Sequence, residues 1–128
     1  MIYEIAVLPV HKDKISEFRQ AFGDVVPLLT RAGGYRGHVL AKGIETPEIF
    51  NLIVQWRSLD DHTPGFEASD DHARFMSGIQ EYFSGEPTVY HLEGDNTGWR
   101  DYRRGKSGAT VLRAHDGEGS ANSNAGFL

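Results

Sequence analysis

The chain has 128 residues, of which 39% are hydrophobic and 24% charged, a composition typical of a folded domain rather than of a disordered or fibrous chain. Its 13 basic and 18 acidic residues give a formal net charge of -5, which argues against a nucleic-acid partner, and the absence of cysteine excludes disulfides and thiol nucleophiles. The apolar runs are too short to span a membrane and the N-terminus lacks the features of a secretion signal, so we expect a cytoplasmic domain.

The first predicted elements are a strand and a long helix. Residues 2–8 alternate between two faces as a strand does. Apolar residues then recur every three or four positions from about residue 11 to residue 32, which predicts an amphipathic helix. Pro27 removes one backbone donor and is predicted to kink or split this helix, and Gly33 with Gly34 is predicted to end it.

A hairpin is predicted next, with strands over residues 35–42 and 49–57 and a short link between them. Ser58, with an acid three residues later, resembles a capping box and predicts a short helical turn that Pro64 ends. Ser69, followed by two acids, predicts the start of a second helix.

The second helix is predicted to run to about Phe83, and residues 88–93 form the last predicted strand. The order strand, helix, strand, strand, helix, strand predicts an α+β, ferredoxin-like βαββαβ domain with an antiparallel four-stranded sheet, which we place at residues 1–94. Residues 95–128 are rich in Gly, Ser and Asn and read as a C-terminal extension. Within it, Trp99 and Tyr102 are candidate anchors on the domain, and 109–114 is a candidate short strand.

Alternation along each strand divides the sheet residues into two faces. We place one mostly apolar set on the helix-covered face: Tyr3, Ile5, Val7, Phe50, Leu52, Val54, Trp56, Tyr90 and Leu92. The other set mixes polar and apolar side chains: Glu4, Ala6, Leu8, Asn51, Ile53, Gln55, Arg57, Val89, His91 and Glu93. A face with this much apolar surface predicts a partner, and a second copy of the chain is the usual one for a small domain.

His62 is the candidate general base. It follows the strand that contains Trp56, and an imidazole with a pKa near its usual 6.5 accepts a proton readily at neutral pH. Asp60 and Asp61 are close enough in sequence to orient this ring or raise its pKa. The alternative for His62 is a surface histidine that caps a helical turn, and Trp56 either fills the core or lines a pocket.

No cofactor or metal is expected from the motifs. The six histidines lack HExxH or comparable ligand spacing. The glycines after the first helix lack the spacing of a phosphate-binding loop, and no flavin, nicotinamide or haem motif is present.

The chain resembles the antibiotic biosynthesis monooxygenase domain over about residues 1–94. That family shares an aromatic-rich strand ending in tryptophan, then a histidine, then a phenylalanine and a serine before an amphipathic helix. In this sequence these features fall on Trp56, His62, Phe66, Ser69 and Phe75. Residues 87–91 are also similar to the last-strand pattern of one branch of the family.

The resemblance implies a homodimer in which two sheets pack into a barrel, and a cofactor-independent monooxygenase that oxidises a small aromatic or polyketide-like phenol or quinol with O2. His62 is then the expected catalytic base, and the expected apolar walls of the substrate site are Trp56, Phe66, Phe75 and Tyr90. Two alternatives remain open: a polyketide cyclase or isomerase on the same barrel, and a non-catalytic, stress-related dimer that binds a ligand.

Overall fold

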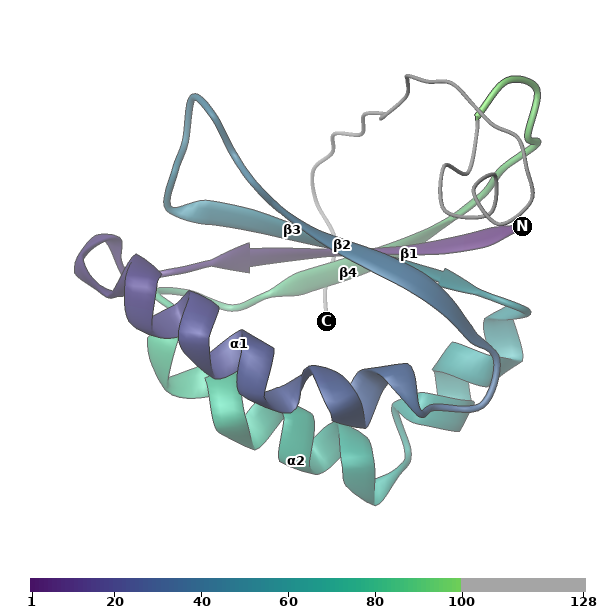
Figure 1. Cartoon of the computed structure of the whole chain (residues 1–128), viewed down its shortest axis with the longest axis horizontal. Helices are drawn as coiled ribbons and strands as arrows, with labels where there is room; N and C mark the ends of the chain where they lie inside the picture. Colours follow the sequence, from purple (N-terminus) through teal and green to yellow (C-terminus); the bar gives the residue numbers. More distant parts are fainter. Residues whose placement is uncertain (100–128) are drawn as a thin grey trace, which may run out of the picture.

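A four-stranded antiparallel sheet carries two helices on one of its faces (Figure 1). The computed structural model describes residues 1–99. The strands are β1 (Ile2–Pro9), β2 (Tyr35–Lys42), β3 (Ile49–Trp56) and β4 (Thr88–Glu93). The helices are α1 (Ile15–Thr30) and α2 (Asp70–Ile79), with short helical segments η1 (Lys12–Lys14), η2 (Asp61–Phe66) and η3 (Gln80–Tyr82).

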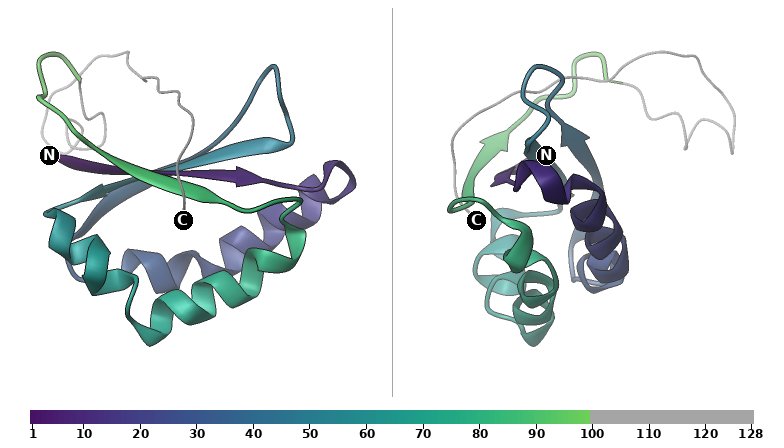
Figure 2. Two further views of the ribbon diagram at one scale, coloured as in Figure 1. Left: turned by 180° about the vertical axis from the view of Figure 1, so that it is seen from behind. Right: turned by 90° about the vertical axis from the view of Figure 1, so that its left-hand side faces the viewer.

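The strands lie in the order β2-β3-β1-β4, and all their pairings are antiparallel. The predicted α+β ferredoxin-like βαββαβ fold is therefore confirmed. Both helices lie on the same side of the sheet, and no described helix or strand covers the opposite, open face (Figure 2). Within residues 1–99, no helix is long and apolar enough to cross a membrane.

The segment after β4 returns to the open face at one point. The indole of Trp99 stacks on the ring of Tyr3, with the ring centroids 6.1 Å apart. Trp99 is therefore placed against the domain, as its aromatic character suggested. The other predicted anchor, Tyr102, and the predicted strand 109–114 lie outside the described residues.

The apolar stripe of α1 faces the sheet as predicted, through the buried residues Phe18, Phe22, Val25 and Leu29. Pro27 does not split the helix, because α1 continues through it to Thr30. Proline deletes only one backbone hydrogen bond of the helix. The buried side chains of Val25 and Leu29, on either side of the proline, hold this turn against the core.

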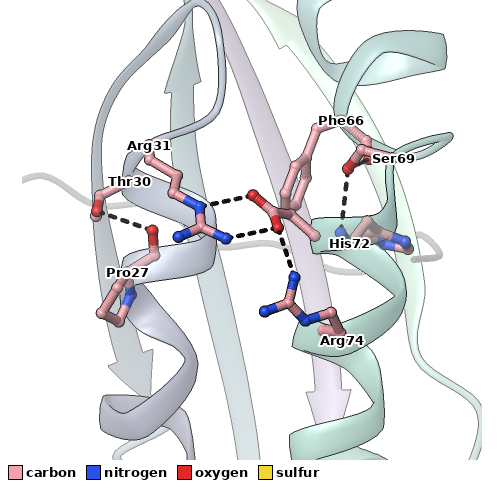
Figure 3. A network of polar contacts seen from close by, with 8 residues as sticks. Pro27, Thr30, Arg31, Phe66, Ser69, His72 and Arg74 are labelled. Atoms are coloured by element: carbon pink, nitrogen blue, oxygen red, sulfur yellow. Dashed lines mark hydrogen bonds and ion pairs between the residues drawn. The ribbon is translucent and has the colours of Figure 1, made fainter.

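The N-terminus of α2 is capped and tied to α1. The Ser69 hydroxyl accepts a hydrogen bond from the backbone N–H of His72, which confirms the predicted helix start. In the same turn the Asp71 carboxylate accepts two hydrogen bonds from the Arg31 guanidinium, at 2.7 and 2.8 Å, and one from Arg74 at 3.2 Å (Figure 3). These bonds fix the N-terminal end of α2 beside the C-terminal end of α1.

The strand register corrects the predicted division of the sheet faces. Glu4 of β1 lies opposite both Val54 of β3 and His91 of β4, so all three side chains share the helix-covered face. The prediction was right for β3 and wrong for β1 and β4. The open face therefore carries Tyr3, Ile5, Val7, Asn51, Ile53, Tyr90 and Leu92. In β1 and β4 both alternate sets contain apolar residues, so hydrophobicity alone did not decide which set faces the helices.

A buried acid–base network as the candidate active site

His62 lies in η2, the segment that follows β3 and folds back over its last residue. The imidazole stacks on the Trp56 indole, with centroids 5.3 Å apart and an interplanar angle of 21°. His62 is only 2% exposed. It is therefore a buried group beside an aromatic ring, and the alternative of a surface histidine is wrong.

Asp61 anchors the turn that carries His62. Its carboxylate accepts hydrogen bonds from the Arg57 guanidinium at 2.7 and 2.9 Å and from the Ser58 hydroxyl at 2.9 Å. The backbone N–H of Arg57 donates to the carbonyl of Gly34, whose φ is +84°. A Cβ on Gly34 would overlap the Asp61 carboxylate. The role of Asp61 in this structure is thus to hold the turn, and another carboxylate faces the imidazole.

That carboxylate belongs to Glu4, which is 4% exposed. Its Oε1 lies 3.3 Å from Nε2 of His62 and accepts a hydrogen bond from the Trp56 indole N–H at 3.0 Å. The other ring nitrogen of His62, Nδ1, is 2.8 Å from Nε2 of His91. Both nitrogens of His62 are therefore engaged, one by an acid and one by a second imidazole. Glu67 is more distant, with its Oε2 at 4.0 Å from His62 Nε2.

Burial gives these groups unusual proton affinities. Desolvation of the carboxylate raises the pKa of Glu4 to about 7, although the Trp56 hydrogen bond opposes the shift and the negative charge of Glu67 adds to it. Burial lowers the pKa of His62 to about 4, against the attraction of Glu67 and with a smaller contribution from His91 and His72. At neutral pH the imidazole of His62 is thus uncharged while Glu4 is close to half-ionised. The predicted upward shift of the His62 pKa is wrong in direction, because desolvation outweighs the nearby negative charge.

Burial also lowers the pKa values of the two neighbouring histidines, His72 and His91. His91 lies on the edge strand β4 and is only partly buried. It is therefore the member of the chain Glu4–His62–His91 that lies nearest to solvent. Among residues 1–99, no group of three or more metal-ligating side chains is arranged to hold a metal ion.

Three of the four predicted aromatic wall residues lie together. The rings of Trp56 and Phe66 have centroids 5.8 Å apart, and those of Phe66 and Phe75 are 6.0 Å apart. All three side chains are buried in the hydrophobic core, and Trp56 is the one whose ring stacks on His62. Tyr90 lies apart from them, because its pairing with Ile5 places it on the open face.

The sequence analysis missed Glu4 and His91 as members of the site. Glu4 is the one charged residue of β1, which is a usable signal for a buried functional group, whereas His91 shares β4 with Thr88 and Glu93 and gives no such signal. Their approach to His62, however, depends on the pairing of β1 with β3 and β4, which joins residues far apart in the chain.

Comparisons with known proteins agree with the fold. Residues 1–78 match the model of the family described as "Antibiotic biosynthesis monooxygenase". The uncharacterized protein YczJ of Bacillus subtilis is 31% identical over 93 residues, which span 73% of this chain and 98% of that protein. A Bordetella bronchiseptica structure assigned to antibiotic biosynthesis monooxygenases has a TM-score of 0.71 at 31% identity, covering 73% of this chain and 96% of the other.

A more distant structure shares the fold. SnoaB of Streptomyces nogalater, described as a cofactor-independent oxygenase, has a TM-score of 0.64 at 14% identity and covers 75% of this chain and 94% of its own. The family match extends over more than half of the chain, and it includes β1, β3, η2 and most of α2. The chain belongs to the antibiotic biosynthesis monooxygenase family.

Proposed function

We propose that this protein is a cofactor-independent monooxygenase that oxidises a small aromatic or polyketide-like phenol, quinol or anthrone with O2. Family membership supports an oxygenase, and the fold shared with SnoaB supports one that works without a cofactor. The observation that carries the proposal is the buried network around His62: an uncharged imidazole between a carboxyl group and a second imidazole, enclosed by aromatic rings.

The chemistry requires a proton acceptor in a site that excludes water. Removal of the acidic proton from the substrate gives an anion rich enough in electrons to reduce O2 by one electron. The substrate radical and superoxide then combine into a peroxide. Loss of water from the peroxide leaves one oxygen atom in the product as a carbonyl, and the second oxygen atom leaves as water. The network around His62 supplies the proton-accepting function: burial keeps the His62 ring neutral over the neutral pH range, and Glu4, with a pKa of about 7, can hold the proton.

The apolar surroundings of His62 serve the same chemistry. Trp56, Phe66 and Phe75 present aromatic rings on one side of the network, which favours a flat aromatic substrate over a polar one. Tyr90 lies on the open face, so we propose that it contacts substrate there, beside a second subunit.

The test is O2 uptake by the purified, metal-stripped protein with a panel of anthrones, quinols and naphthols. We expect uptake that needs the protein and no added cofactor, and we expect His62→Ala to lower kcat/KM by roughly 100-fold or more. His11→Ala is the matched control, because His11 is exposed and lies beyond the last residue of β1, whereas Glu4 lies near the first residue of that strand. Full activity in His62→Ala on a confirmed substrate would overturn the assignment of the base.

A cyclase or isomerase remains the second candidate, and one observation favours it. A carboxyl group with a pKa of about 7 can both donate and accept a proton at neutral pH, which suits proton transfers within a substrate without oxygen. Turnover under strictly anaerobic conditions would support this candidate. Saturable binding of aromatic ligands without any product would instead support the non-catalytic, stress-related dimer.

We also propose that the working form is a homodimer joined through the open face of the sheet. That face exposes apolar side chains, among them Val39 and Leu92, each about half exposed. It also contains the side-chain oxygen of Asn51, which is buried and has no hydrogen-bond donor within the described part of the chain. A second subunit would cover the exposed apolar residues of this face.

A further inference from the structure

His62 has no ring nitrogen left for a substrate. Its Nε2 faces Glu4 Oε1 at 3.3 Å, and its Nδ1 faces His91 Nε2 at 2.8 Å. The His91 contact has hydrogen-bond geometry, while the Glu4 contact is an approach at ion-pair distance. A neutral imidazole has one N–H donor and one bare nitrogen acceptor, so hydrogen bonds at the two contacts would have opposite directions. A substrate proton can therefore reach His62 directly only if one of these contacts breaks.

We propose that Glu4, His62 and His91 form a proton relay in which a proton enters at His91, passes through His62 and is stored on the carboxyl group of Glu4. The proposal rests on the proposed function only for the source of the proton, and the relay itself follows from the geometry. Three features support it: the unbroken chain of contacts, the burial of Glu4, and the position of His91 on the edge strand.

The two end states of the relay are fixed by hydrogen-bond chemistry. In the charged state, Glu4 is a carboxylate that accepts from His62 Nε2–H, and His62 Nδ1 accepts from His91 Nε2–H. In the neutral state, the Glu4 carboxyl O–H donates to His62 Nε2, and His62 Nδ1–H donates to His91 Nε2. The Trp56 N–H donates to Glu4 Oε1 in both states.

One proton converts the first state into the second. It binds the bare Nδ1 of His91, the proton on His91 Nε2 moves to His62 Nδ1, and the proton on His62 Nε2 moves to Glu4. Each bond that breaks is replaced by a new N–H or O–H bond, and no imidazolium persists at either end. His62 changes only its tautomer, while the combined charge of the Glu4, His62 and His91 side chains rises from minus one to zero.

The surrounding charges set the pH at which this change occurs. Glu67 from the segment after η2, and His72 from α2, are the other titratable groups that act on His62. The negative charge of Glu67 raises the pKa of Glu4, and burial raises it further, to about 7. The tautomer change should therefore have its midpoint near neutral pH, where a phenol is a useful proton donor.

The experiment is imidazole 15N NMR of the full chain, from about pH 5 to about pH 9, which distinguishes the protonated from the bare nitrogen of each ring. The His62 signals are assigned with His62→Gln. We expect His62 to carry its proton on Nδ1 at low pH and on Nε2 at high pH, with one midpoint near pH 7. A single tautomer throughout, or a doubly protonated ring, would overturn the relay.

Two variants distinguish the role of Glu4 from that of the nearby carboxylate of Glu67. Glu4→Gln should abolish the tautomer change, because an amide cannot store the proton. Glu67→Gln is the matched control: it removes a carboxylate near the same nitrogen, so the change should persist with its midpoint at a lower pH. Loss of the change in Glu67→Gln but not in Glu4→Gln would contradict the assignment. The wild-type titration needs neither variant, so the test stands even if one of them folds poorly.

Kinetics then connect the relay with turnover. On a confirmed substrate, the kcat/KM profile of the wild type should rise with a pKa near 7, Glu4→Gln should remove that limb, and His91→Gln should lower kcat/KM by roughly 100-fold. A tautomer change without O2 uptake would support the relay and refute the oxygenase. O2 uptake that depends on His62, with no tautomer change, would overturn the relay and leave the oxygenase standing.

Discussion

At the scale of single residues, Glu4 decides the character of the site. A carboxylate in an apolar interior is costly, and the side chain of Glu4 contacts the Trp56 N–H and the His62 ring. The result is a carboxyl group that takes up its proton near neutral pH. Perturbed pKa values of this kind cluster at functional sites, so a carboxyl group buried beside a histidine marks a candidate for chemistry.

The first prediction concerns stability against pH. The folded-state pKa of Glu4 is raised from 4.5 to about 7, so its contribution to the free energy of unfolding is full below pH 4.5 and is lost as the pH rises through 7. The pKa of His62 is lowered from 6.5 to about 4, so its contribution is full above pH 6.5 and is lost as the pH falls through 4. Between these limits the two slopes oppose each other.

Glu4→Gln removes the first of these slopes. The difference in unfolding free energy between Glu4→Gln and the wild type should therefore increase by up to about 3 kcal/mol as the pH rises from 4.5 to 7. Urea denaturation followed by Trp fluorescence at several pH values measures it. A difference that stays constant over this range would show that Glu4 ionises normally in the folded protein.

Some residues of the site could be predicted from the sequence and others could not. His62 and Trp56 were predicted because they are neighbours in the chain and belong to a local family pattern. Glu4 and His91 were assigned to the wrong face, because both alternate sets of β1 and of β4 contain apolar residues. Their place in the site depends on long-range strand pairing, which no local pattern records.

At the scale of elements, η2 is the part that positions the chemistry. It is the only connection between β3 and α2, and it returns the chain over Trp56 so that His62 enters the core. Ser58 and Ser69 were predicted at its two ends from their spacing to acids, and both make local hydrogen bonds there. The predicted stop at Pro64 coincides with a break in the helical backbone, because Thr63, directly before it, is non-helical with φ of -131° and ψ of 108°, and a second short turn then continues to Phe66.

Gly34 should be essential for this arrangement. Its positive φ is strained for any other residue, and a methyl group there would displace the Asp61 carboxylate that holds η2. We expect Gly34→Ala to lower the unfolding free energy by about 1–3 kcal/mol and to weaken the stacking of His62 on Trp56. Thermal unfolding and Trp fluorescence report the two effects.

Gly33→Ala is the matched control for that variant, because a Cβ at Gly33 meets nothing within 4 Å. Equal losses of stability in the two variants would contradict the specific role given to the Gly34–Asp61 contact.

At the scale of the whole molecule, the two helices cover one face of the sheet and leave the other face open. The helices cover the face that holds the acid–base network (Figure 2), while the open face has exposed apolar side chains, among them Val39 and Leu92. The elements, their order and the sheet type were all predictable, because hydrophobic periodicity and turn residues determine them locally. The proposed dimer follows from the apolar side chains that the open face exposes.

Ile53 of β3 lies on the open face, where it is paired with Ile5 of β1. Ile53→Glu should convert the dimer to a monomer, because it would bury a charge between two subunits. Leu59→Glu, which alters an exposed apolar residue after β3, should leave the dimer intact. Sedimentation velocity distinguishes the two. A wild-type monomer at all accessible concentrations would refute the proposed dimer.

The central claim is that the network around His62 serves an oxygenase, and isotope labelling tests it most directly. The protein is incubated with an oxidisable phenol or anthrone under 18O2 in ordinary water, and the product is analysed by mass spectrometry. We predict one 18O atom in each product molecule, with labelling that disappears in His62→Ala. Product that forms without O2 and carries no label would contradict the account and identify an isomerase or cyclase instead.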